Sequence, residues 1–217
     1  MEKKDSFETL LSFIYGTERT VEACAHGAYR DIQRNLTGIN SNKMPVEKKV
    51  KWRDDIEKLI RKRVDILSTD PEAFDTWHKE TCDAICAESK RHNISTWVEW
   101  LKPMENGFTY GLAQKWLNMT IKNMLLMAQE EWAWLDQIKS YLHVPVDKYV
   151  LDEAYKQLDV RAKFEDKFTS LAWSRWNDYD DLYFGFQERI RKVVNQREDY
   201  DSPMGWEFVA WVNARGN

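Results

Sequence analysis

Apolar side chains recur along most of this chain at the spacing of an α-helix. Residues 7, 10, 11 and 14 follow the i, i+3, i+4, i+7 order of one helical face, and Gly16 ends that pattern. The segment 112–135 is apolar on most faces, which predicts one long and deeply buried helix. Alternating strand patterns and internal repeats do not stand out. The pattern therefore predicts an all-α fold.

Turn and capping residues set the bounds of the other predicted helices. Asp70 precedes a proline, and a capping residue followed by proline in the first turn is a strong helix start. The stretch 38–45 is rich in turn-forming residues and predicts a loop, whereas 143–147 predicts an extended connector. We expect helices at 17–36, 46–67, 71–91, 95–101 and 148–158, and further helices on both sides of a break at 202–205.

Composition places the chain among globular proteins and adds one unusual feature. Of its 217 residues, 43% are hydrophobic and 31% are charged, which suits a single helical domain spanning 1–217. The 11 tryptophans are enough to build a large core and to leave some rings for stacking on flat ligands. Cys24, Cys82 and Cys86 are an odd and sparse set, which argues against disulfides and for a reducing compartment.

The chain shows no sign of a membrane or export segment. No run approaches the ~20 apolar residues that cross a bilayer, and the N-terminus lacks the apolar stretch and cleavage site of a signal peptide. We therefore expect a soluble, cytoplasmic monomer with no membrane partner. In a bacterial or archaeal cell it would be associated with the nucleoid.

The net charge of −4 does not by itself indicate a nucleic-acid ligand. Its distribution is more informative, because residues 47–63 hold eight basic and four acidic side chains. A local basic face can bind DNA even on an acidic protein, since phosphate contacts act within about a Debye length. The alternative for this segment is a solvated helix with mixed charges.

One stretch in the middle of the chain combines the residue types that catalysis needs. A turn containing Gly107 and Gly111 opens a helix, and first-turn amides from Gly111 to Gln114 lack helical partners, so they can bind a phosphate. Lys115 lies about one turn further on among apolar neighbours, where desolvation favours the neutral, nucleophilic amine. Asp147 stands at the predicted start of another helix, whose dipole favours its charge.

This combination resembles the helix-hairpin-helix DNA glycosylases, in which a glycine hairpin, a lysine in the next helix and a downstream P-V-D occur together. It is most similar to the archaeal 8-oxoguanine DNA glycosylase branch. The similarity rests on the long spacing from Lys115 to Asp147, on the second lysine at Lys122, and on V-P-V-D at 144–147. It covers about 45 residues, between 105 and 151.

The resemblance implies a fold, a site and a reaction. The fold would be a two-lobed helical domain with a helix-hairpin-helix-like catalytic element at 95–160 and a cleft between the lobes. Lys115 would be the Schiff-base nucleophile and Asp147 the catalytic carboxylate, with no metal and no cofactor. The DNA contacts would come from Gly107, Gly111, Gln114 and Lys122.

The substrate implied is duplex DNA carrying a damaged or modified base. An oxidised purine is the default, and a hypermodified pyrimidine of phage DNA, in a defence role, is the other substrate considered. The extruded base would be sandwiched by aromatic rings. The candidates are Trp97, Trp100, Trp132, Trp134, Trp206 and Trp211.

The chain also departs from the bacterial members of this superfamily. Their L-P-G-V-G hairpin is absent, Lys148 follows the aspartate where they favour threonine, and the four-cysteine iron–sulfur site of some members is missing. Structural interpretations of the key residues stay open as well. A lone lysine on a helix is commonly a surface residue, and an aspartate after Pro-Val is commonly an N-cap.

Three weaker patterns give other hypotheses. His78, Cys82 and Cys86 share one helical face and are either a packed face or, with the distant His92, the start of a zinc site. A second enzyme class comes from Arg19 and His26, which resemble the R-x(4–6)-H motif of the HEPN-type, metal-independent ribonucleases. A third hypothesis is a non-enzymatic helical adaptor whose exposed aromatic side chains bind a partner protein.

Overall fold

The chain folds into helices throughout the part that the structure describes. The computed structural model describes residues 9–12, 16–33, 36, 44–67, 69–94, 108–162, 172–177 and 179–216, without the side chains of residues 71, 215 and 216. The α-helices are α2 (Val21–Ile32), α4 (Val46–Val64), α5 (Pro71–Arg91), α6 (Tyr110–Met127), α7 (Lys148–Leu158), α8 (Gly185–Val194) and α9 (Pro203–Gly216). Two 3₁₀ segments, η2 (Glu130–Ile138) and η3 (Trp173–Arg175), and the π-helical η4 (Tyr179–Phe184) complete them. The predicted all-α class is confirmed.

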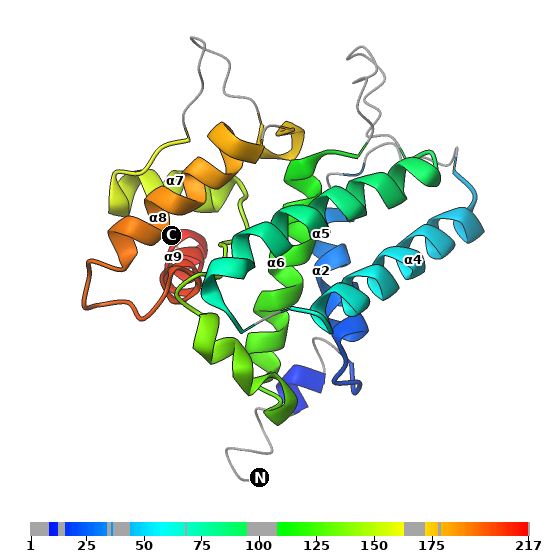
Figure 1. Ribbon diagram of the computed structural model, residues 1–217, viewed down its shortest axis with the longest axis horizontal. Helices are drawn as coiled ribbons and strands as arrows, with labels where there is room; N and C mark the ends of the chain where they lie inside the picture. The colour runs from blue at the N-terminus through cyan, green and yellow to red at the C-terminus, as the bar shows by residue number, and fades with distance from the viewer. Residues whose placement is uncertain are drawn as a thin grey trace.

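Helix α6 runs through the middle of the molecule (Figure 1). Helices α2, α4 and α5 pack together on one side of it, and α7, α8 and α9 form a second group on the other. The main helical contacts of α6 are with α2 and α5. None of the described helices is long and apolar enough to span a membrane.

Tryptophan rings fill the core where α2, α4 and α6 meet. Trp52 and Trp116 are both fully buried, and their ring centroids lie 5.4 Å apart in an edge-on arrangement. Each indole N–H still has an acceptor. Trp116 Nε1 donates to the Ala25 carbonyl at 2.9 Å, and Trp52 Nε1 donates to Ser89 Oγ at 3.0 Å. The rings therefore contribute apolar burial without leaving a polar atom unpaired.

The prediction of one long helix at 112–135 is wrong in one respect, because this segment divides into α6 and η2. Ala128 takes a left-handed conformation with φ of 46°, and its N–H bonds the Met124 carbonyl, which ends α6. The buried residues that follow, Trp132, Leu135 and Ile138, repeat every three positions. That period suits a 3₁₀ helix, so both the buried face and the helix type change after Ala128.

Most other predicted bounds hold to within about a turn or lie outside the described residues. The break predicted at 202–205 is wrong in position, because α9 already begins at Pro203. Asp70 caps α5 by accepting the N–H of Glu72 at 3.1 Å, and the helix predicted at 148–158 is α7. Helix α2 starts at Val21 rather than at residue 17, since the Thr20 side chain caps it. Helix α4 ends at Val64, three residues before the predicted bound. The helix predicted at 95–101 and the turn at 105–107 lie outside the described residues.

A close backbone contact explains the glycine at position 111. A Cβ placed there would lie 2.0 Å from the carbonyl oxygen of Trp173 and 3.1 Å from its carbonyl carbon. The Gly111 N–H also donates to the Trp176 carbonyl at 2.8 Å. Glycine is needed because only a residue without a side chain lets the segment 172–177 lie directly on the first turn of α6.

We expect Gly111→Ala to destabilise the protein by about 1–3 kcal/mol, because the added methyl group displaces backbone rather than a flexible side chain. Urea unfolding followed by circular dichroism measures the loss. Gly185→Ala is the matched control, since its nearest neighbour is the end of the Arg189 side chain at 3.3 Å. That control should stay within about 1 kcal/mol of wild type. Equal stability of the two variants would contradict this account.

Candidate active site

Lys115 and Asp147, 32 positions apart in the sequence, meet in the structure. Lys115 Nζ lies 2.8 Å from Asp147 Oδ2 and 3.1 Å from the carbonyl oxygen of Pro145. The lysine is 6% exposed. The ammonium group therefore has two protein acceptors, one of which is a carboxylate.

Asp147 uses its two carboxylate oxygens for different purposes. Oδ1 accepts the N–H of Val150 at 2.9 Å and so caps α7, while Oδ2 binds Lys115. The sequence suggested an N-cap and a catalytic carboxylate as competing interpretations. The geometry makes them compatible, because the capping bond fixes the side chain in the orientation that brings Oδ2 to the lysine.

This ion pair lies at the wall of a pocket of about 580 Å³, here called the Lys115 pocket. Residues from α6, the start of α7, η3 and α9 line it. Tyr149, Trp173, Phe208 and Trp211 contribute aromatic rings to its lining. Its volume is within the range of about 300–1,000 Å³ that is usual for small-molecule sites. The lining also holds two buried lysines, Lys115 and Lys122, and two carboxylates, Asp147 and Asp31 of α2. Aromatic rings beside a buried amine and a carboxylate suit a flat ligand attached to an electrophilic carbon.

A second lysine–carboxylate pair borders the same pocket. Lys122 Nζ lies 2.5 Å from Glu207 Oε2, and it lies over the rings of Phe208 and Trp211, 4.7 and 5.7 Å from their centroids. Glu207 is fully buried, and burial raises its pKa, although the charge of Lys122 opposes that shift. Lys122 was predicted as a DNA contact; it is 7% exposed and belongs to the pocket lining.

The phosphate site predicted at the start of α6 is not formed in this structure. The N–H groups of Tyr110, Gly111 and Leu112 donate to Asn177 Oδ1, the Trp176 carbonyl and Thr109 Oγ1. This first turn is buried against the segment 172–177, so its amides have protein acceptors instead of an exposed anion site.

Gln114 also differs from its predicted role as a DNA contact. Its side chain is fully buried. Oε1 accepts the N–H of Val146 at 3.2 Å, and Nε2 donates to the carbonyl oxygens of Val146 at 3.1 Å and Gly111 at 2.8 Å. The residue therefore holds the backbone beside Asp147. Gly107, the remaining predicted contact, lies outside the described residues.

The four tryptophan candidates that the structure describes separate into three groups. Trp211, predicted as a candidate for the base pocket, lines the Lys115 pocket. Trp206 does not, because its ring is fully buried and its Nε1 donates to Gln157 Oε1 at 3.1 Å. Trp132 and Trp134 line a different pocket, beside the C-terminal end of α4. Trp97 and Trp100 lie outside the described residues.

Sequence reasoning missed several residues of this site, among them Tyr149, Trp173, Phe208 and Glu207. Trp173 and Phe208 were not distinguished from core aromatics, because the segments that carry them are brought to α6 only by the tertiary fold. Glu207 was missed for the same reason. A carboxylate inside an otherwise apolar stretch, Trp206 to Trp211, was the one available signal.

The zinc hypothesis finds little support in the described residues. His78 and Cys82 are fully buried, and His78 Nε2 lies 2.8 Å from Asn118 Oδ1. Burial raises the pKa of the Cys82 and Cys86 thiols. His78, Cys82 and Cys86 are also not among the metal-binding side chains that gather within 4.8 Å of one another in the described part of the chain. The packed-face interpretation suits these contacts.

His92 belongs to another group, with Asp55 and Glu88. This is the one set of metal-binding side chains that gathers within 4.8 Å in the part of the chain described. Its members already form ion pairs, in which His92 Nε2 lies 3.0 Å from Asp55 Oδ2 and 3.3 Å from Glu88 Oε1.

The two residues of the HEPN-like motif have different partners. His26 Nδ1 lies 3.0 Å from Glu57 Oε1. The Arg19 guanidinium donates to the Gly16 carbonyl at 2.7 Å and to Ser12 Oγ at 3.0 Å. No observation in the described residues favours this ribonuclease over the lysine–aspartate site.

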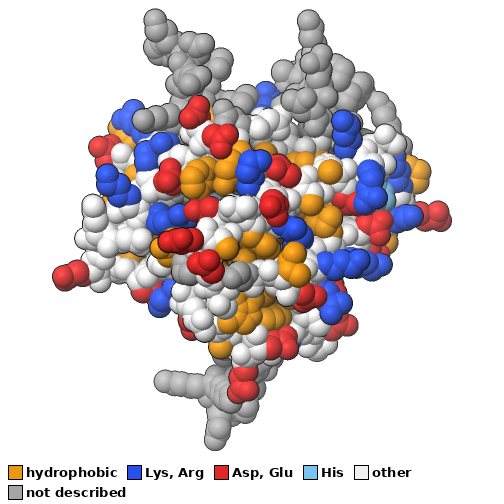
Figure 2. All heavy atoms as spheres, viewed as in Figure 1, with side chains coloured by type: hydrophobic (Ala, Val, Ile, Leu, Met, Phe, Trp, Pro, Cys, Tyr) orange, Lys and Arg blue, Asp and Glu red, His pale blue; other side chains and the backbone are white. Residues whose placement is uncertain are grey.

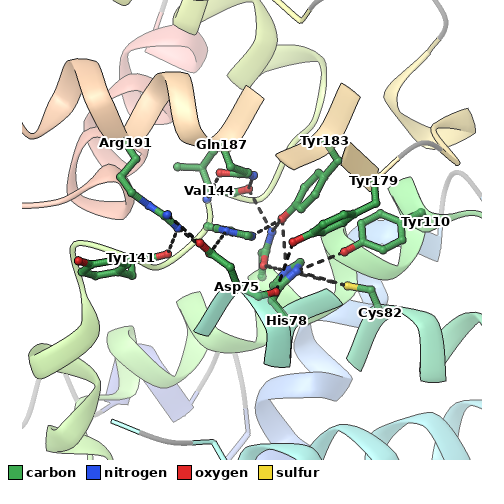
Figure 3. A network of polar contacts seen from close by, with 12 residues as sticks. Asp75, His78, Cys82, Tyr110, Tyr141, Val144, Tyr179, Tyr183, Gln187 and Arg191 are labelled. Atoms are coloured by element: carbon green, nitrogen blue, oxygen red, sulfur yellow. Dashed lines mark hydrogen bonds and ion pairs between the residues drawn. The ribbon is translucent and has the colours of Figure 1, made fainter. Parts of the chain in front are cut away.

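A buried polar network lies behind the connector, the extended segment 142–147 (Figure 3). The Asp75 carboxylate accepts hydrogen bonds from both terminal nitrogens of Arg191, at 2.9 and 2.8 Å. One of its oxygens also lies 2.9 Å from His143 Nε2. The Tyr183 hydroxyl lies 3.0 Å from His143 Nδ1 and 3.2 Å from His78 Nε2. Burial lowers the pKa of both histidines, whereas Arg191 and His143 outweigh burial and hold the pKa of Asp75 below its usual value.

The lowered pKa of His78 and His143 predicts an acid-sensitive fold. Below the ordinary histidine value of 6.5 the unfolded chain binds protons that the folded chain does not, so stability is lost as pH falls. We expect the free energy of unfolding to drop by about 1.4 kcal/mol per pH unit for each ring that stays neutral. Urea unfolding at pH 7 and pH 5, with NMR titration of the histidine rings, checks this. Rings that titrate near 6.5 in the folded protein would contradict it.

Comparison with protein-family models, with curated proteins and with solved structures finds no match for this chain. Evidence on function therefore comes from the site itself.

Proposed function

We propose that this protein is a DNA glycosylase that excises a damaged or modified base through Lys115 and Asp147. The observation that carries the proposal is the buried ion pair, with Nζ and Oδ2 2.8 Å apart, at the wall of an aromatic pocket. A buried lysine beside a carboxylate is the arrangement that an amine nucleophile needs, since the carboxylate accepts the proton that blocks the amine.

The proposed reaction begins with transfer of a proton from the Lys115 ammonium to Asp147. The free amine attacks C1′ of the deoxyribose, the bond from C1′ to the base breaks, and the base leaves with that electron pair and takes up a proton. Opening of the sugar ring yields a protonated imine between Nζ and C1′. Loss of a proton from C2′ then expels the 3′ phosphate, which gives the enzyme a β-lyase activity.

The pocket and the surface fit this substrate class in different ways. An extruded nucleoside needs a recess with rings for stacking, which Trp173, Phe208 and Trp211 can supply. The flanking DNA needs basic side chains, and Lys and Arg gather over α4 with acidic side chains between them (Figure 2). In this proposal the pocket opens into a cleft between two helical lobes. The base is an oxidised purine or a hypermodified pyrimidine.

Borohydride trapping tests the nucleophile. Wild-type protein, duplex oligonucleotides carrying modified bases and sodium borohydride should give a covalent adduct visible on a denaturing gel. Lys115→Gln should abolish that adduct, and Asp147→Asn should slow its formation by about 10²–10⁴-fold, because the amine loses its proton acceptor. The control is Lys156→Gln, which changes an exposed lysine of α7 outside the pocket lining and should leave the rate unchanged.

The oligonucleotide panel should include an oxidised purine, a glucosylated hydroxymethylpyrimidine and an abasic site. An adduct that persists in Lys115→Gln would assign the nucleophile to another residue. Absence of any adduct from wild-type protein across the panel, together with no release of free base, would refute the glycosylase.

Stacking on the pocket rings gives a separate prediction. Trp211→Ala should weaken binding of the modified duplex by about 1–3 kcal/mol, the usual contribution of one base on one aromatic ring. Fluorescence anisotropy with Lys115→Gln as the background prevents turnover during the titration. Val209→Ala, an exposed change on the same helix, is the control. Unchanged affinity in Trp211→Ala would place the base elsewhere.

A further inference from the structure

The connector is a buried extended segment, and in the described helices around it the inner backbone groups already bond within each helix. Residues 142–146 are all buried, and none of them belongs to a helix. Its backbone groups therefore need partners from side chains, because an unpaired buried N–H or C=O is costly. The connector also carries the two groups that Lys115 contacts, the Pro145 carbonyl and the Asp147 carboxylate.

Two glutamines supply those partners in the same way. The Gln187 carboxamide, from α8, accepts the Val144 N–H at 3.0 Å and donates to the Val144 carbonyl at 2.8 Å. The Gln114 carboxamide, from α6, makes the equivalent pair of bonds to Val146. Each carboxamide thus bonds both the N–H and the C=O of one residue, as a neighbouring strand does in a β-sheet. We call these two carboxamides the amide clamp.

The clamp holds the connector on both sides of the lysine contact. Pro145 lies between Val144 and Val146, the two clamped residues, and its carbonyl accepts from Lys115 Nζ at 3.1 Å. The polar network behind the connector supports the same geometry (Figure 3). Asn118 Nδ2 donates to the Val144 carbonyl at 3.1 Å as well as to the Tyr183 hydroxyl at 2.8 Å.

We propose that Gln187 is a positioning residue for the reaction, which acts through the connector on Lys115 and Asp147. This inference rests on the proposed function. Gln187 contacts the backbone of Val144, and it does not line the pocket. Its 2% exposure and its paired bonds fix the connector from the α8 side, as Gln114 does from α6. Reaction rates depend steeply on such placement, since a shift of about 1 Å can cost 10²-fold.

Gln187→Met tests the proposal, because methionine keeps the length of the side chain and loses both hydrogen bonds. With an oligonucleotide that wild-type protein traps, the single-turnover rate of adduct formation should fall by about 10–100-fold. The affinity for the same duplex, measured in the Lys115→Gln background, should change by less than about threefold. This split separates positioning from substrate binding.

A stability-matched control separates positioning from general destabilisation. Ile60→Ala removes buried apolar volume from α4, in the other group of helices, and should lower the unfolding midpoint without slowing adduct formation. All assays are run where circular dichroism shows each variant fully folded. A trapping rate for Gln187→Met within twofold of Ile60→Ala would overturn the proposal.

A measurement without DNA tests the positioning role of Gln187 separately from the glycosylase activity. Formaldehyde with cyanoborohydride methylates accessible neutral amines, and peptide mass spectrometry reports each lysine. Gln187→Met should raise the methylation rate of Lys115 severalfold relative to Lys148, because the contacts of Lys115 with Pro145 and Asp147 loosen. If wild-type protein traps no substrate, the glycosylase fails, yet this rate still decides whether Gln187 positions Lys115. An unchanged Lys115 rate overturns the positioning role in either case.

Discussion

The burial of the connector constrains the rest of this structure more than any single apolar contact does. Extended backbone inside a helical protein has no neighbouring strand, so its N–H and C=O groups must bond side chains. Here those side chains come from α6 and α8, and the network from Asp75 to Tyr183 extends the arrangement to α5. The connector thereby ties three helices together, and its last residue caps a fourth, α7.

The two lysine–carboxylate pairs on α6 are costly features for a protein to keep. Removing charges from water carries a large desolvation penalty, and replacing such pairs by apolar side chains often stabilises a fold. The lysines of both pairs line the same pocket, and they lie two turns apart on α6. Charges retained at that cost beside a cavity are typical of a site that uses them, which is why the Lys115 pocket is the strongest functional candidate among the described residues.

Local patterns predicted much of the fold, and tertiary contacts account for the rest. The start of α7 could be predicted because Asp147 follows Pro-Val and precedes an amphipathic stretch, and the same residue was correctly selected as a partner for Lys115 in space. The break at Ala128 could not be predicted, because the residue has no intrinsic preference for a left-handed cap. The prediction of a phosphate site failed for a related reason. The segment 172–177, which is distant in sequence, covers the start of α6 and bonds its amides. Gln187 carried no local signal, because its partner lies 43 positions away. The apolar stretch around Glu207 marked that carboxylate as unusual but could not identify its partner Lys122, which lies 85 positions away.

The contact between Gly111 and the Trp173 carbonyl connects helix packing to the shape of the cavity. Trp173 is part of the pocket lining, and its backbone can lie where it does only because position 111 has no side chain. The depth of the recess is therefore set partly by a residue that is absent from its lining. Homologous sequences that carry a larger residue there would need a displaced 172–177 segment and a differently shaped recess. Ligand preference can then change among related proteins without any exchange of the residues that a ligand touches.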